Sequence, residues 1–522
     1  MQSRSSWHTI SYALVLLAVA GSAVACSSGN NSSAGADGGG GASSGGLTPV
    51  LPCTDSVASV YADPGDVTSQ AKGAILKCAF DQNLSASQLL AAAEVTYDAG
   101  EAPPPWPPPA YSGKPFTSGA HVYRVLYRTE RGDPNDTPGY SSALVLLPDT
   151  PRAAAMPVVV ASHGSRGQAG PCASSLEGAA AWYVDPDFIH QVYPLVGLGY
   201  AVIAPDLAGY ANFGGANNPP SAYADTADVG KSTLDAVAAL RNVLPSASLT
   251  QQIAITGHSQ GGHTALSALA LAGSYPVSGT IAAVAVYAPL WISQRAWATI
   301  FLEPSMFSLA QSSAGPVSLW YHYTHAALLD GPDAGADSIF DPTKLGVVQS
   351  FVDNDCWSAS YPDLLDAGAT ANAFFTSSYV ADIGPASAGL GTCGSDSACT
   401  TWLARMTADW PHLTGAAATT PILVVYANDD TTITPDVMQC VYERLSTDGA
   451  DYRVCYDPNP VGHSGSVSEN SDYVADWIAQ QTLGGAAPSE ACQMLDANDS
   501  GVPQLTTADA APIACNPLLS TQ

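Results

Sequence analysis

Short runs of almost wholly apolar residues recur through the middle of the chain. Such runs are typical of parallel strands that are buried on both faces of a sheet, whereas a half-exposed strand alternates apolar and polar residues. Helical patterns stand between them, for example at 231–244 and 436–445. This alternation predicts an α/β fold with a mostly parallel, doubly wound central sheet flanked by helices. The predicted strands are 157–161, 201–204, 253–255, 281–287, 421–426 and a less apolar last one, 452–455.

The chain before these runs has a different pattern. Residues 121–127 and 142–147 predict two strands on either side of a turn, which would open the sheet with an antiparallel pair. The preceding stretch, 67–97, is predicted to be helical, most clearly at 89–93, where leucine and alanine follow one another. The proline run 103–109 predicts a stiff spacer.

The interval 291–419 lacks the alternation of strands and helices. The chain after residue 50 is longer than a usual single domain, so we expect one large core, 51–290 and 420–486, with this interval as an insertion. The insertion is expected to form a helical lid or cap over the site. It could equally be a helical subdomain with its own small core, and both can hold. Its large apolar residues include Trp291, Trp297, Phe301, Met306, Phe307, Trp320, Phe351 and Trp357.

A G-x-S-x-G pentapeptide centred on Ser259 follows the predicted strand 253–255 and precedes a helix of small residues. This context is typical of a nucleophile elbow, in which a strained backbone lifts the serine hydroxyl above the sheet. Gly257 and Gly261 leave room for the close approach of strand and helix. The amide of Gln260 and the positive end of the helix would face a developing oxyanion. The alternative is an ordinary strand-to-helix turn.

Candidates for an acid and a base follow in the chain order Ser, Asp, His that such a site requires. Asp429 and Asp430 come soon after a predicted strand, and either could orient the base. His463 follows the last predicted strand on a loop, where the base is expected. His258 and His263 adjoin the nucleophile in sequence but are badly placed to accept its proton, so they are predicted to be packing residues.

A second donor for the oxyanion is expected just after the strand 157–161. Gly164 permits a close approach there, and the amide of Ser165 is the predicted donor opposite Gln260. The hydroxyl of Ser165 is a candidate third donor. With these groups Ser259 would attack an ester carbonyl, form an acyl-enzyme and be released by water.

Three stretches together resemble the α/β-hydrolase superfamily and, more narrowly, the secretory lipase family, which includes lipase A-type enzymes of yeasts and their bacterial relatives. The resemblance covers about 67–484 and implies an α/β-hydrolase fold with a helical cap, acting on acyl esters. The insertion itself matches no lid of that family, so the predicted class is carboxylesterase or lipase. The three stretches are 162–165 with 172–175, 199–206 with 209–210, and 257–263 with 287–289.

The resemblance also bears on single residues. In the family the triad acid stands three positions before a β-branched apolar residue, which favours Asp430, since Ile433 follows it at that spacing. Asp206, in the second stretch, is expected to fix a turn. A peptidase that uses the same triad, and a non-catalytic tethered surface module, are the alternatives to an ester hydrolase.

The net charge of −29, from 16 Lys and Arg against 45 Asp and Glu, argues against nucleic acid as a partner and against binding to an anionic bilayer by charge. The predicted partner is a small-molecule or lipid ester. No CxxC motif or Cys/His cluster stands in the sequence, so neither a metal nor another cofactor is predicted.

The N-terminus predicts export. Residues 1–26 have a basic start, a short apolar core and a cleavage site that resembles a bacterial lipobox at Cys26, and a Ser/Gly-rich tether follows at 27–50. We therefore expect a membrane-anchored lipoprotein or an extracellular protein, with ordinary cleavage after Ala25 as the alternative to lipidation.

The cysteine count fits this prediction. Lipidation of Cys26 leaves ten of the 11 cysteines, enough for five disulfides, some of them in the tail 487–522. The predicted pairs are Cys53–Cys78, Cys393–Cys399, Cys440–Cys455, Cys492–Cys515 and, by remainder, Cys172–Cys356.

Overall fold

A computed structural model describes residues 46–94, 110–176, 188–488 and 493–494, apart from 292–293, 306, 311, 313, 332–338, 359–360, 428 and 460. The predicted export signal with Cys26, most of the tether, the proline spacer and nearly all of the tail 487–522 lie outside these residues. Within the described residues, no helix combines the length and apolarity that crossing a bilayer requires.

The described residues form a mixed ten-stranded sheet in the order β1-β2-β3-β5-β4-β6-β7-β8-β9-β10. The first three strands and the junction of β3 with β5 are antiparallel, the centre from β5 to β9 is parallel, and β10 closes the far edge antiparallel to β9. The strands are β1 (Ile75–Leu84), β2 (Ala120–Glu130), β3 (Pro138–Pro148), β4 (Met156–Ser162), β5 (Val202–Ala208), β6 (Leu249–His258), β7 (Thr280–Tyr287), β8 (Ile422–Ala427), β9 (Tyr452–Asp457) and β10 (Gln493–Met494).

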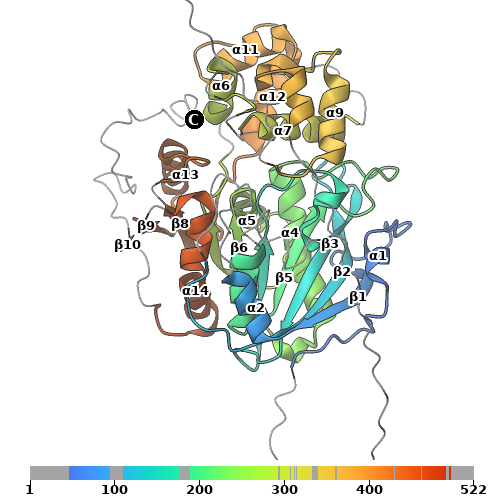
Figure 1. Ribbon diagram of the computed structural model, residues 1–522, viewed down its shortest axis with the longest axis vertical. Coiled ribbons are helices and arrows are strands. Elements are labelled where there is room, and N and C mark those ends of the chain that lie inside the picture. The colour runs from blue at the N-terminus through green and yellow to red at the C-terminus, as the bar shows by residue number, and fades with distance from the viewer. Residues whose placement is uncertain are drawn as a thin grey trace, which may run out of the picture. The chain divides into compact units, whose positions relative to one another are not determined.

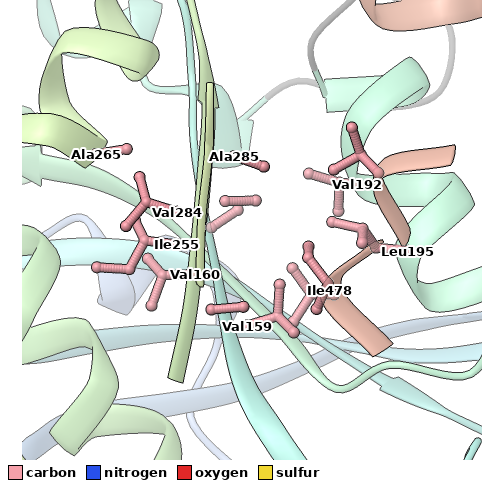
Figure 2. Close-up of a cluster of buried hydrophobic side chains, with 14 of the residues drawn as sticks. Val159, Val160, Val192, Leu195, Ile255, Ala265, Val284, Ala285 and Ile478 are labelled. Carbon is pink, nitrogen blue, oxygen red and sulfur yellow. The ribbon is translucent and has the colours of Figure 1, made fainter. Parts of the chain in front are cut away.

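Helices cover both faces of this sheet, because the central strands are apolar on both sides. Figure 2 shows the alternation: Val160 and Val284 point toward α5, whereas Val159 and Ala285 point to the opposite side, where Ile478 of α14 lies. The core therefore continues through the sheet. The helices outside the insertion are α1 (Val57–Val60), α2 (Ala86–Ala93), α3 (Tyr193–Gly197), α4 (Thr226–Val243), α5 (Gln260–Leu271), α13 (Pro435–Thr447) and α14 (Gly462–Leu483), with short turns η1 (Gly170–Cys172), η2 (Ser174–Leu176), η4 (Phe188–Val192) and η5 (Ser246–Ser248).

The chain between β7 and β8 is helical and gathers beyond one end of the sheet (Figure 1). It has a core of its own, in which Trp320 stacks on Phe351 with 5.0 Å between ring centroids. Trp291, by contrast, packs into the core of the sheet, and Met306 lies outside the described residues. The elements of the insertion are α6 (Gln294–Leu302), α7 (Ala314–Leu329), α9 (Leu345–Asn354), α10 (Pro362–Ala367), η6 (Ala371–Phe374), α11 (Ser377–Ser387) and α12 (Ser397–Ala408).

The α/β prediction and the antiparallel opening of the sheet are confirmed by β2 and β3 and by the parallel centre. The prediction of a helix over 67–97 is wrong in large part. Residues 75–84 form β1, which pairs with β2, and a helix covers only 86–93. That helix begins at a capping box, in which Ser85 and Gln88 bond to each other's backbone amides.

Three predicted disulfides are present: Cys53–Cys78, Cys172–Cys356 and Cys393–Cys399. Cys440 and Cys455 also form disulfides. That they pair with each other, as Cys440–Cys455, stays a prediction. The pair Cys492–Cys515 lies outside the described residues.

Candidate active site

Ser259 stands at a sharp turn between β6 and α5. Its φ of 53° and ψ of −119° lie in a region that L-residues rarely adopt, so the backbone is strained there. The flanking glycines are required by crowding. A Cβ on Gly257 would come 2.1 Å from the Gly261 carbonyl oxygen, and one on Gly261 would come 2.1 Å from the Ser162 carbonyl oxygen. The turn is held by the Ser259 amide, which donates to the Tyr287 carbonyl at 2.9 Å.

His463 lies in the first turn of α14 and is oriented by Asp430. Its Nδ1 is 2.7 Å from Asp430 Oδ2. The other oxygen of that carboxylate accepts from the amides of Thr432 and Ile433, at 2.8 and 2.9 Å. The carboxylate is therefore fixed before it meets the imidazole, and with Nδ1 donating, the Nε2 atom is left as the proton acceptor.

Asp429 has a different partner. Its Oδ1 accepts from the amide of Gly462 at 2.9 Å, one residue before His463. Of the two candidate acids, the structure brings Asp430 to the imidazole and uses Asp429 to fasten the start of α14.

The residue before Ser259 touches the base. The ring of His258 packs against that of His463 with centroids 4.3 Å apart, and its Nε2 is 3.2 Å from the His463 carbonyl oxygen. Ser259 and His463 are thus neighbours through His258. Among the described residues, no hydrogen bond joins the Ser259 hydroxyl to the His463 imidazole, and such bonds are often long before substrate binds.

The two predicted oxyanion donors lie on α5 and on the loop after β4. Gln260 is the first residue of α5, so its amide has no acceptor within the helix. The loop after β4 runs against the same helix turn, because a Cβ on Gly261 would also come 2.7 Å from the His163 carbonyl oxygen. Ser165 lies two residues further along that loop and is partly exposed.

Asp206 fastens this loop, as the sequence indicated. It is fully buried on β5 and accepts hydrogen bonds from Ser142 Oγ at 2.6 Å, Ser174 Oγ at 2.8 Å and the Ser175 amide at 2.7 Å. His163 lies beside it, with Nε2 3.3 Å from the Asp206 carbonyl oxygen. Burial, and next the Arg166 guanidinium, lower the pKa of His163, so this ring stays neutral.

The insertion also holds the loop after β4. The disulfide Cys172–Cys356 joins the two. The amide of Trp357 donates to the Arg166 carbonyl at 2.8 Å. The loop that carries one predicted oxyanion donor is therefore positioned from the core and from the insertion together.

One group of side chains among the described residues could offer three metal ligands: Asp225, His325 and Asp409, all buried. Their atoms already satisfy one another. His325 Nε2 lies 3.0 Å from Asp409 Oδ2 and 3.6 Å from Asp225 Oδ2, Tyr321 donates to Asp409 at 2.6 Å, and the Thr226 amide donates to Asp409 at 3.1 Å. We interpret the group as an ion-pair network that joins α7 and α12 of the insertion to α4 of the core.

The titration of this network follows from its burial. Burial raises the pKa of Asp225 to about 7, with a further contribution from Asp409. Burial acts to lower the pKa of His325, but the carboxylates of Asp409 and Asp225 outweigh it and raise that pKa. A proton is therefore retained within the group near neutral pH.

His263, predicted to pack, lies in the same region. Its Nε2 is 2.9 Å from the Asp409 carbonyl oxygen, and burial lowers its pKa. Its Nδ1 lies 3.3 Å from Ser267 Oγ, so both ring nitrogens have partners away from the base. Tyr223, which the sequence did not indicate, contacts a predicted site residue: its hydroxyl lies 2.5 Å from Ser165 Oγ, across 58 residues of chain. The sequence around Tyr223 contains no motif that would have marked it as a candidate.

The sequence of this chain matches one protein family. The profile of the alpha/beta hydrolase family matches residues 158–477. No curated protein is significantly similar to the chain in sequence.

Solved structures show the same fold at low identity. The rice cell wall degrading esterase LipA from Xanthomonas oryzae, in a ligand-bound form, is 16% identical with a TM-score of 0.56, and the match covers 79% of this chain and 99% of that one. Candida antarctica lipase A in its closed state is 15% identical with a TM-score of 0.56, covering 89% and 92%. A hydrolase from Legionella pneumophila is 16% identical with a TM-score of 0.59, covering 78% and 98%.

Proposed function

Because this chain belongs to the alpha/beta hydrolase family, we propose that it is a serine hydrolase that cleaves carboxylic esters through an acyl-enzyme on Ser259. The observation that carries the proposal is the pairing of His463 with Asp430 at 2.7 Å beside the strained turn at Ser259. A turn that served only to connect a strand to a helix would need neither the strain nor a buried carboxylate aimed at a neighbouring imidazole.

The reaction begins with proton transfer. His463 Nε2 accepts the proton of the Ser259 hydroxyl while the oxygen attacks the ester carbonyl carbon. The carbonyl π bond breaks, and its electron pair becomes the oxyanion of a tetrahedral intermediate. Asp430 holds the imidazole by Nδ1 and stabilises the imidazolium that forms. The electron pair of the oxyanion then re-forms the carbonyl π bond, and the bond from the carbonyl carbon to the alcohol oxygen breaks. His463 donates its proton to that oxygen, the alcohol leaves, and the acyl group stays on Ser259.

Hydrolysis of the acyl-enzyme repeats these steps with water. His463 accepts a proton from water, the hydroxide attacks the acyl carbon, and the proton returns to Ser259 as the carboxylic acid leaves. In both halves the oxyanion is stabilised by the amides of Gln260 and Ser165. Removing one such donor typically costs about 2.7–4 kcal/mol of transition-state stabilisation.

The structural neighbours favour a carboxylic ester as the substrate, because they include an esterase and a lipase. The resemblance to secretory lipases points the same way. We also propose that the protein is exported, with Cys26 as the site of a lipid anchor, a location that disulfides such as Cys172–Cys356 fit.

The test is hydrolysis of p-nitrophenyl esters from acetyl to palmitoyl by the purified protein. We expect the Ser259→Ala variant to lose at least about 10³-fold of the rate. Ser274→Ala, at an exposed serine after α5, serves as the matched control and should act as the wild type does. Near-wild-type hydrolysis by Ser259→Ala would refute the proposal. Cleavage of aminoacyl-anilides in place of every ester would make the protein a peptidase.

A further inference from the structure

The hydroxyl of Ser165 is held by a buried phenol. Ser165 Oγ lies 2.5 Å from the hydroxyl of Tyr223. Tyr223 is fully buried, whereas Ser165 is partly exposed on the loop that runs against the first turn of α5. The serine hydroxyl therefore has one fixed partner inside the protein, while Ser165 itself remains partly open to solvent.

Chemistry sets the direction of this hydrogen bond. A phenol is a stronger acid than an aliphatic alcohol, so it is the better donor and the poorer acceptor. Burial raises the pKa of Tyr223 above its ordinary value, so the phenol keeps its proton. With Tyr223 donating, the Ser165 oxygen acts as acceptor and the Ser165 proton remains available for another group.

Tyr223 is itself fixed by the insertion. Its amide donates to Thr324 Oγ1 at 2.9 Å, and its ring packs against that of Trp320 with centroids 6.1 Å apart. Both partners lie on α7. A donor held in this way needs little reorganisation when charge develops, which is the property that makes an oxyanion site effective.

We propose that Tyr223 and Ser165 form a hydroxyl relay that gives the oxyanion a third hydrogen bond. Tyr223 donates to Ser165 Oγ, and Ser165 donates its own proton to the oxyanion of the tetrahedral intermediate. Both O–H bonds stay intact throughout, so no proton is transferred. The proposal rests on the proposed ester hydrolysis and deepens it, because it adds a side-chain donor to the amides of Ser165 and Gln260.

The two residues have different roles in this scheme. Ser165 touches the reacting oxygen and is a catalytic residue, whereas Tyr223 acts through Ser165 and is a positioning residue. Because Tyr223 is held by α7, the insertion contributes to catalysis by fixing a donor. The disulfide Cys172–Cys356 ties the same loop to the insertion at a second point.

A double-mutant cycle tests the relay in the full chain. Ser165→Ala keeps the backbone amide and removes only the hydroxyl, while Tyr223→Phe removes only the phenolic oxygen. The readouts are kcat and KM for an ester and the rate at which a fluorophosphonate labels Ser259. The control is Tyr361→Phe. Tyr361 is also a buried tyrosine whose ring packs against Trp320, and its hydroxyl accepts from the Ser358 amide at 3.0 Å.

We expect Ser165→Ala and Tyr223→Phe each to lower kcat by at least about ten-fold, with KM changed by less than about three-fold. The double variant should lose no more than the worse single variant, because the two hydroxyls act as one unit. The phosphonate labelling rate should fall in parallel. Tyr361→Phe should keep kcat within about two-fold of the wild type.

If the wild type hydrolyses esters, two results would overturn the relay alone. One is a double variant in which the kcat losses of the two single variants multiply, and the other is single variants with unchanged kcat. If Tyr223→Phe fails to fold, Ser165→Thr decides, because threonine keeps the hydroxyl and must retain most of the kcat that Ser165→Ala loses. A folded wild type that hydrolyses no ester and takes up no phosphonate would overturn the proposed function and the relay with it.

Discussion

Asp235 gives a prediction whose sign and size follow from its surroundings. It lies on α4 with 2% of its surface exposed, and its Oδ2 accepts from Thr129 Oγ1 at 2.7 Å and from the Tyr275 hydroxyl at 2.8 Å. Burial raises the pKa of Asp235 from 3.8 to about 6, although both hydrogen bonds act in the opposite direction. The folded protein therefore holds a proton that the unfolded chain has already released.

The sign follows from proton binding. Between pH 4 and 6 the native state binds this proton and the unfolded state does not, so the free energy of unfolding falls as the pH rises. The contribution is fully present below the unfolded pKa and is lost once the pH passes about 6. A shift of about two units at 1.36 kcal/mol per unit gives a loss of about 3 kcal/mol.

The assay is urea unfolding of wild type and Asp235→Asn at pH 4, 5, 6 and 7. Asparagine mimics the protonated carboxyl, so the stability of the wild type minus that of the variant should fall by about 2 kcal/mol from pH 4 to 6, which is most of the total, and then level off. Asp366→Asn, at an exposed position on α10, is the control and should give a nearly constant difference. A difference that is flat within about 0.5 kcal/mol, or that rises with pH, would refute the reasoning.

Two further predictions concern the base. Asp430→Asn should lower kcat by on the order of 10⁴-fold at neutral pH, because an amide donor would hold His463 in the wrong tautomer. The side chain of Asp429→Asn can still accept from the Gly462 amide, so kcat of that variant should stay within a few-fold of the wild type. Equal losses of kcat in the two variants would mean that the acid is misassigned. His258→Ala should lower kcat about ten-fold or more, with little change in KM, and should move the downfield proton resonance of the His463 Nδ1–H. His258→Phe keeps the ring contact, so it should restore most of the kcat and most of the resonance position. An unmoved resonance with a lowered melting temperature would reduce His258 to packing alone.

Most of the sheet could be predicted because its central strands are buried on both faces. A run such as Val158-Val159-Val160 has few other stable places in a protein, and it lies in β4 at the centre of the sheet. β1 gave no such signal. It is an edge strand with mixed burial and carries Lys77, Asp81 and Gln82, so its pairing with β2 and the disulfide Cys53–Cys78 decide its conformation.

In the candidate site, too, the residues that could be predicted are those that the strands of the sheet position. Ser259, Asp430 and His463 could be found because each follows a strand whose end fixes its place, and the order of the strands is regular in this fold. The residues around Asp429 and Asp430 left both open as the acid, and only the family spacing to Ile433 favoured Asp430. In the structure Asp430 bonds to the His463 imidazole, whereas Asp429 accepts from the Gly462 amide.

Tyr223 could not have been found in this way, because its place is set by tertiary contacts. Its position relative to Ser165 depends on how α7 packs, and α7 belongs to the insertion, for which the sequence predicted no individual contacts. The strand ends determine where a nucleophile, an acid and a base stand, but they do not determine what supports the oxyanion loop. If the relay holds, the insertion contributes to the rate of the chemical step, so substitutions at Thr324 or Trp320 should lower kcat without any contact to the substrate.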